Sequence, residues 1–348
     1  QAFLATSTRS EVQLGTTGDL TVGYAMTPFG GEERVTLQVK TPTQTIAFGP
    51  SGGRVYDWQV TGMAPFVAGD TFGQDGLIMD MLWLPAGARW SGDEVEEMAL
   101  LGCTNSGREV TVTYECALKK SLPGVVLRKT YRIPATTPTL EVEVTFRNER
   151  VDAEPVTLAY WSHNVIKADA AHYVGAQMTH ATPKGATTIW PAEGLPAELQ
   201  PEIVMPKHII SATSPVYAEY FPQSQSGLIM RLPDSFMTVY RWSAYGKPVC
   251  GSEWMSRPLV LGAGTSQTLR FSLTAVPAAT PETLKAALAA QAQAPSGEGN
   301  LLPFGFGKLN AQGLPAGWRI RTHGANPAAV DVTAAPDETG ETVVTLTL

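Results

Sequence analysis

Residues 140–147 read Leu-Glu-Val-Glu-Val-Thr-Phe-Arg, with an apolar side chain at every second position. Successive side chains of a β-strand point to opposite faces of the sheet, so this alternation predicts a strand with one buried face. The same pattern occurs in residues 110–118 and again in residues 269–275. These segments predict an all-β fold.

Segments of this kind repeat from about residue 12 to residue 276, separated by turn residues such as Ser-Leu-Pro-Gly at 121–124. The 33 glycines and 26 prolines among 348 residues favour tight turns over helices. We therefore expect one large antiparallel, two-layer β-sandwich of well over ten strands, spanning residues 1–276.

The sequence after this region predicts a helix and a linker over residues 277–299. Thr280, Pro281 and Glu282 form an N-cap, a proline at the first helical position and an acidic first turn, ahead of an alanine-rich stretch. Residues 295–299, Pro-Ser-Gly-Glu-Gly, have the composition of a linker.

Residues 300–348 are predicted to be a small β segment. Their start, from Asn300 to Leu-Pro-Ala-Gly-Trp at 314–318, resembles the opening of carbohydrate-binding jelly-roll modules. The segment is too short for a complete jelly roll. It is expected to be either a partial module packed on the main domain or the front of a longer chain.

Composition excludes several classes of partner. The 25 Lys and Arg against 32 Asp and Glu give a net charge of −7, which disfavours nucleic acid. No apolar run reaches the roughly 18 residues of a membrane-spanning helix.

Gln1 in place of Met fits an exported, processed protein, so a periplasmic or extracellular location is one expectation, with the compartment left open. No feature indicates an oligomeric state.

Motifs for metals and cofactors are weak or absent, and we expect no cofactor. Gly-Pro-Ser-Gly-Gly at 49–53 matches a nucleophile elbow, but residues 54–60 read as a strand where a helix should begin, so a turn is predicted. Neither a Walker A sequence nor G-x-G-x-x-G is present. The three cysteines contain no C-x-x-C pair, and His163, His172 and His180 lack metal-site spacing.

His163 and Glu253 are the candidate catalytic residues. By strand parity His163 shares a face with Trp161, while Leu158 and Tyr160 lie on the other. If that other face packs in the core, His163 and Trp161 look into a groove on the outer side. The alternatives are a structural histidine inside the protein and, for Glu253, a solvated turn residue. An imidazole and a carboxylate in one cleft can share proton transfer.

These residues resemble the galactose-mutarotase-like β-supersandwich family, which includes the aldose 1-epimerases, over roughly residues 15 to 276. Three features carry the resemblance: Gly-Gly-Arg at 52–54, His163 followed by Asn164, and Glu253 before Pro-Leu-Val-Leu-Gly-Ala-Gly at 258–264. The resemblance implies that Glu253 is the base on the anomeric hydroxyl and that His163 protonates the ring oxygen.

One family feature is missing. Family members with full activity carry an earlier histidine in a Leu-His-Gly-Gly-like element, whereas no histidine precedes His163 here. Asp75 and Asp80 lie in about that region, and a carboxylate can replace the missing proton donor only if its pKa is raised. The expected substrate-binding residues are Arg54, Asp75, Asp80, Trp161 and Trp254.

Three functions remain as hypotheses. The first is a carbohydrate-active protein that catalyses anomeric interconversion of an aldose. The second is a non-catalytic carbohydrate-binding or structural module, in which the groove persists without chemistry. The third is a polysaccharide lyase or hydrolase-related domain, in which Tyr160 or His163 acts on a uronic acid. The acidic net charge opposes the third, because an anionic polymer favours a basic groove.

Overall fold

The computed structural model divides the protein into two compact units, residues 1–296 and residues 297–348. It describes residues 12–49, 53–63, 76–85, 87–91, 97–120, 122–150, 154–167, 177–182, 185–188, 203–204, 209–211, 216–221, 225–232, 236–244, 249–292, 331–336 and 342–347. Asp75, His172 and Asn300 to Trp318 lie outside these residues.

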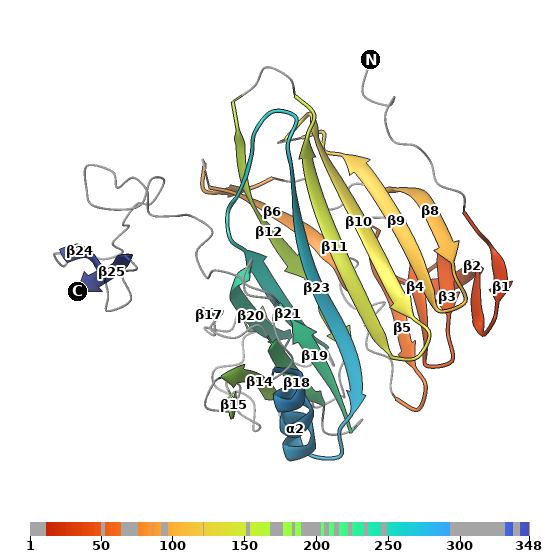
Figure 1. Ribbon diagram of the computed structural model, residues 1–348. Coiled ribbons are helices and arrows are strands. Elements are labelled where there is room, and N and C mark those ends of the chain that lie inside the picture. The colour runs from red at the N-terminus through yellow and green to blue at the C-terminus, as the bar shows by residue number, and fades with distance from the viewer. Residues whose placement is uncertain are drawn as a thin grey trace. The chain divides into compact units, whose positions relative to one another are not determined.

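The first layer of the larger unit is an antiparallel sheet of nine described strands (Figure 1). In spatial order these are β15 (Gly185–Thr188), β14 (Gln177–Thr182), β18 (Val216–Phe221), β19 (Ser226–Arg231), β23 (Ser266–Pro277), β11 (Thr139–Asn148), β10 (Val125–Pro134), β9 (Glu109–Ala117) and β8 (Ala99–Asn105). The three segments with the clearest alternation are β11, β9 and β23. Their apolar positions are buried, apart from the half-buried Cys116 at the end of β9, which confirms the predicted faces.

The second layer contains two sheets that meet where Val55 and Leu77 form an antiparallel bridge. One is β1 (Gly15–Thr17), β2 (Leu20–Phe29), β3 (Glu32–Lys40), β4 (Gln44–Phe48) and β5 (Val55–Val60), paired in chain order. The other follows the order β16 (Ile203–Val204), β20 (Phe236–Ala244), β21 (Val249–Ser256), β12 (Val156–His163), β6 (Met79–Leu84) and β7 (Arg89–Trp90). Its shorter strands are β13 (Val165–Lys167), β17 (Ile209–Ser211) and β22 (Leu259–Leu261).

A continuous hydrophobic core lies between the two layers. It joins Trp58 of β5, Val142 of β11, Tyr160 of β12 and Trp254 of β21 with apolar side chains of β2, β3, β4, β6, β9, β10, β19 and β23. The outer face of the first sheet carries cross-strand polar pairs, such as Arg128 of β10 with Glu115 of β9 and Arg270 of β23 with Glu143 of β11. This two-layer, all-β arrangement confirms the predicted fold class.

The predicted turn at residues 49–53 does lead into a strand, β5, and not into a helix. Gly53, with a φ of 53°, takes the left-handed conformation that glycine adopts at little cost. A strand follows the motif where a nucleophile elbow would open a helix, and residues 50–52 lie outside the described part of the chain.

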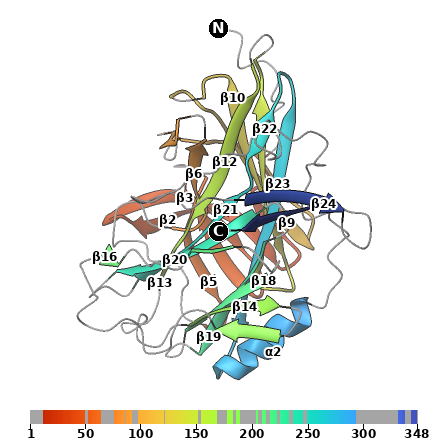
Figure 2. The ribbon, with the colours of Figure 1, turned by 90° about the vertical axis from the view of Figure 1, so that its left-hand side faces the viewer.

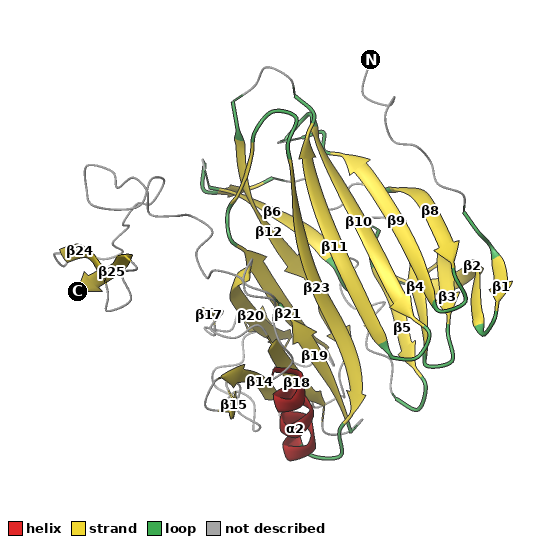
Figure 3. Ribbon diagram, viewed as in Figure 1, coloured by secondary structure: helices red, strands yellow, loops and turns green. Residues whose placement is uncertain are grey.

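Helix α2 (Pro281–Ala292) follows β23 and begins where the sequence predicts it (Figure 3). Thr280 is its N-cap, because the Thr280 side-chain oxygen accepts a hydrogen bond from the Thr283 amide at 3.3 Å. Leu284 and Leu288 pack on β18 and β19, so the helix covers the outer face of the first sheet at these strands (Figure 2).

The smaller unit contains two described strands, β24 (Asp331–Pro336) and β25 (Thr342–Thr347), which form an antiparallel hairpin. This hairpin agrees with the expectation of a small β segment. The division of residues 1–276, 277–299 and 300–348 into functional parts remains a prediction.

Candidate functional site

His163 and Glu253 meet at the end of β12. Strands β12 and β21 pair antiparallel with Ser162 opposite Trp254, so the next step of the register places His163 opposite Glu253. The His163 Nδ1 atom lies 2.6 Å from the Glu253 Oε1 atom, which is hydrogen-bond distance. Sheet pairing therefore brings together two residues that are 90 positions apart in the chain.

Trp161 holds the second oxygen of the same carboxylate. Its indole Nε1 donates a hydrogen bond to Glu253 Oε2 at 2.5 Å. Glu253 is buried, with 6% of its surface exposed, while the His163 side chain is 18% exposed. The carboxylate is thus fixed from two sides, and the imidazole is the more accessible member of the pair.

These three side chains lie on the face of the sheet away from the core. Along β12 the side chains of Leu158, Tyr160 and Ser162 are buried, whereas Trp161 and His163 are partly exposed. This alternation confirms the parity argument from the sequence. Glu253 is buried, which excludes the alternative of a solvated turn residue.

Arg54 approaches this strand end from the five-stranded sheet. Its guanidinium Nη1 lies 3.2 Å from the sulfur of Met79, and Met79 is the β6 residue directly opposite His163. The guanidinium also lies 5.7 Å and 5.9 Å from the ring centroids of Phe29 and Tyr56, within cation–π range. The structure thus places a cation against β6 at the residue that pairs with His163 of β12.

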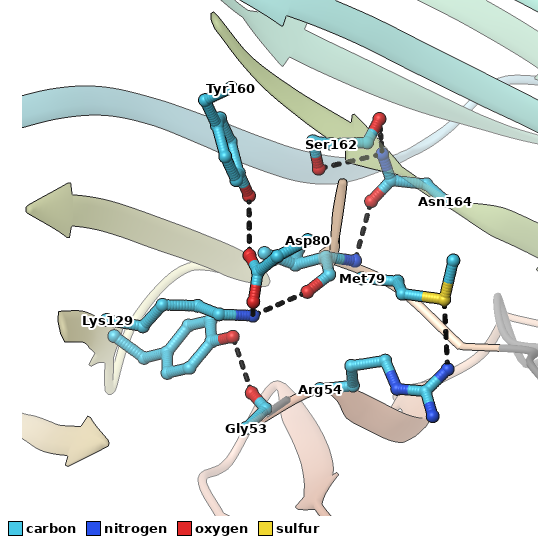
Figure 4. Close-up of polar contacts among 10 residues, drawn as sticks. Gly53, Arg54, Met79, Asp80, Lys129, Tyr160, Ser162 and Asn164 are labelled. Atoms are coloured by element: carbon cyan, nitrogen blue, oxygen red, sulfur yellow. Dashed lines mark hydrogen bonds and ion pairs between the residues drawn. The ribbon is translucent and has the colours of Figure 1, made fainter. Parts of the chain in front are cut away.

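A buried ion pair lies on the core side of the same strands (Figure 4). Lys129 Nζ is 2.7 Å from Asp80 Oδ2, and the Tyr160 hydroxyl donates to Asp80 Oδ1 at 3.1 Å. Burial raises the pKa of Asp80 and lowers the pKa of Lys129, because removal from water disfavours both charged forms. The sequence pattern signals this lysine, since parity places Lys129 on the face shared by Leu127 and Tyr131.

Two expected substrate-binding residues take other positions. Asp80 faces Lys129 in the core, although burial does raise its pKa as a substitute donor would need. Trp254 is 1% exposed and packs edge-on against Phe271, with ring centroids 5.4 Å apart. Both residues therefore lie beneath the face that carries His163, and neither lines an outer groove. Asp75 falls outside the described residues.

The sequence did not point to Met79 or Ile78, and it marked Asn164 only as the residue that follows His163. Asn164 is 1% exposed, and its Oδ1 accepts the Ile78 amide at 2.7 Å. No periodicity marks these contacts, because Ile78 and Met79 are ordinary apolar residues until the fold places them beside β12. Among the described residues no group of three or more His, Cys, Asp or Glu side chains is arranged to hold a metal ion. None of the described helices is long and apolar enough to cross a bilayer.

No family model matches the sequence, and no curated protein matches it either. Solved structures do share the fold. The Slr1438 protein of Synechocystis sp. PCC 6803 superposes with a TM-score of 0.55 at 13% identity, covering 73% of this chain and 100% of that one. A galactose mutarotase-like protein of Clostridium acetobutylicum superposes with a TM-score of 0.53 at 9% identity, covering 74% of this chain and 99% of that one.

A galactose mutarotase-like protein of Lactobacillus casei gives a TM-score of 0.50 at 14% identity, covering 69% of this chain and 100% of that chain. At such identities the likeness is one of architecture. This protein has the all-β sandwich fold of the galactose mutarotase-like proteins.

Proposed function

We propose that the protein binds a sugar ring against the outer face of β12 and β21 and interconverts its anomers. The observation that carries this proposal is the 2.6 Å contact between His163 Nδ1 and Glu253 Oε1. The fold supports a carbohydrate ligand, because structures that share it include galactose mutarotase-like proteins.

Anomeric interconversion requires one proton to leave the anomeric hydroxyl and another to reach the ring oxygen. Both oxygens are bonded to the same carbon, so an adjacent base and acid can contact both at once. In this proposal the Glu253 carboxylate takes the hydroxyl proton, and protonated His163 donates to the ring oxygen. These transfers break the bond between the anomeric carbon and the ring oxygen and leave an open-chain aldehyde. Rotation of the aldehyde about its bond to the next carbon, followed by reclosure with the reverse transfers, gives the other anomer and returns both groups to their starting states.

Two further residues have proposed roles at this site. Trp161 keeps the Glu253 carboxylate oriented toward His163 through its indole hydrogen bond. Arg54 supplies positive charge near the hydroxyl oxygens of a bound sugar, from its position beside Met79. We do not propose direct sugar contacts for Asp80 or Trp254, because both side chains face the core.

Exchange of α and β anomers of free aldoses, followed directly by NMR, tests the proposal. Glu253→Gln removes the base and keeps the shape of the side chain, so catalysed exchange should be lost while sugar binding persists. His163→Ala should lower turnover by a factor of about 10² or more. Glu143→Gln is the matched control, because it makes the same chemical change on the polar face of β11, where Glu143 pairs with Arg270. Equal loss of exchange in Glu143→Gln and Glu253→Gln would contradict a specific role of Glu253.

A second candidate is carbohydrate binding without catalysis, favoured by the lack of any histidine before His163. Wild-type protein that binds an aldose but leaves exchange at the buffer rate would select this candidate. Tyr160 cannot act as the base of a lyase, because its side chain is buried in the core and its hydroxyl donates a hydrogen bond to Asp80.

A further inference from the structure

The segment Gly76 to Met79 connects the two sheets of the second layer at the candidate site. Leu77 exchanges two backbone hydrogen bonds with Val55, at 3.0 and 3.1 Å, and Val55 directly follows Arg54. On the other side, the Val165 amide donates to the Gly76 carbonyl at 2.9 Å. The segment is therefore bonded both to the strand that begins beside Arg54 and to the chain just after His163.

Ile78, in the middle of this segment, has a φ of 61°. A β-branched residue in the left-handed region is a true outlier, because its side chain crowds its own backbone there. Such conformations persist only where surrounding contacts enforce them, and they cluster at functional sites. Ile78 is fully buried, so solvent does not satisfy its peptide groups.

Two buried polar side chains hold the backbone of Ile78 from opposite sides. Asn164 Oδ1 accepts the Ile78 amide at 2.7 Å, and Lys129 Nζ donates to the Ile78 carbonyl at 2.7 Å (Figure 4). Each of these groups is itself fixed. Asn164 Nδ2 donates to Ser162 at 3.2 Å (carbonyl) and 3.1 Å (Oγ), and Lys129 is paired with Asp80.

The residue after Ile78 carries this constraint to the outer face. Met79 is directly opposite His163 in the pairing of β6 with β12, and its sulfur accepts from the Arg54 guanidinium. A change in the Ile78 backbone would therefore move Met79, which contacts Arg54 through its side chain and is paired with His163 across the strands.

We propose that Asn164 and Lys129 are positioning residues, which hold Ile78 in its left-handed conformation and thereby fix Arg54 and Met79 relative to His163. The functional part of this inference rests on the proposed function, whereas its geometric part does not. Neither residue contacts the sugar in this scheme, and both act through the backbone of Ile78.

Asn164→Ala removes the acceptor for the Ile78 amide and tests the inference directly. The measurements are anomer exchange, sugar affinity, the methyl signal of Met79 in protein labelled at methionine methyls, and the ring ¹⁵N signals of His163. We expect both signals to shift and kcat to fall by about tenfold or more, with sugar affinity changed less, because small misplacements of reacting groups lower turnover strongly. Asn164→Asp keeps an acceptor for Ile78, so its Met79 and His163 signals should stay closer to those of the wild type.

Gln44→Ala is the matched control for loss of a buried amide. Gln44 is 1% exposed, accepts from Trp58 at 2.7 Å and donates to the Thr137 and Thr139 carbonyls, away from the Ile78 contacts. It should lower stability and leave kcat and the Met79 and His163 signals unchanged. If Gln44→Ala shifts these signals as Asn164→Ala does, the effect is general destabilisation and the inference is wrong.

The remaining outcomes also decide the question. If the Met79 and His163 signals of the Asn164→Ala variant keep their wild-type positions, the inference is wrong, whatever the turnover of the variant. If Asn164→Ala does not fold, Lys129→Met combined with Asp80→Asn removes the second contact to Ile78, and unchanged signals in that variant would overturn it equally. If the wild type does not exchange anomers, the proposed function fails, while the NMR signals still decide whether Asn164 and Lys129 position Met79 and His163.

Discussion

His163 and Glu253 form a cross-strand pair whose Nδ1 and Oε1 atoms are 2.6 Å apart on the outer face of the second layer. A second polar pair lies in the core, where Asp80 of β6, the strand next to β12, meets Lys129 of β10 in the first layer. The first pair is the candidate for chemistry because it is reachable from outside. The second is enclosed and acts on stability and geometry. The predictions below separate these two roles.

Trp161→Phe should lower kcat by about tenfold with KM nearly unchanged. The phenyl ring keeps an aromatic face but loses the indole donor to Glu253 Oε2, a hydrogen bond to a charged group of the kind that contributes about 1.5–3 kcal/mol. Anomer-exchange kinetics measure the effect. Trp58→Phe, which removes the indole donor to Gln44, is the matched control and should change stability only. An increase in KM with constant kcat would assign Trp161 to sugar binding and not to orientation of Glu253.

Removing one member of the buried ion pair should destabilise the protein strongly, whereas removing both should not. Lys129→Met or Asp80→Asn alone leaves an unpaired buried charge, which lowers the free energy of unfolding by about 3–5 kcal/mol. The double variant should recover most of this loss. Denaturant unfolding of the four proteins gives the coupling energy. The partly exposed pair Arg270 with Glu143 serves for comparison and should couple by about 0–1 kcal/mol. Additive effects at Lys129 and Asp80 would show that the two charges are not coupled.

The stability contributed by this pair should depend on pH in opposite directions for its two members. Because burial raises the pKa of Asp80 above 3.8, its contribution is fully present below pH 3.8 and is lost as pH rises through the folded-state pKa. Burial lowers the pKa of Lys129 below 10.5, so its contribution is present above pH 10.5 and is lost as pH falls through the folded-state pKa. The measurement is the free energy of unfolding of the wild type minus that of the double variant with Lys129→Met and Asp80→Asn. This difference should be lowest between pH 3.8 and pH 10.5. A difference that stays constant with pH would contradict both shifts.

Limited proteolysis should cut first between about residues 293 and 300. The linker composition of residues 295–299 and the division of the chain at residues 296 and 297 both point to this region. The expected product is a stable fragment that retains the sandwich and α2, identified by mass spectrometry. First cleavage around residue 150 would show that residues 1–276 do not form one domain.

The sequence by itself determined the strands and their faces. Alternation in residues 140–147 is a local property with a period of two, so it specifies which side chains of β11 are buried without knowledge of any partner strand. The Thr280 cap is equally local, because it depends on residues within one helical turn. Parity likewise placed Trp161 and His163 on one face of β12.

Only the tertiary structure decided what each of these faces meets. Strand register sets the contact between His163 and Glu253, and register depends on pairings between distant segments that no local pattern encodes. The same holds for Asp80, because nearly every position of β6 is apolar and alternation does not reveal which side faces the core. Its partner Lys129 comes from the opposite layer, so the buried pair exists only once the two layers have packed together.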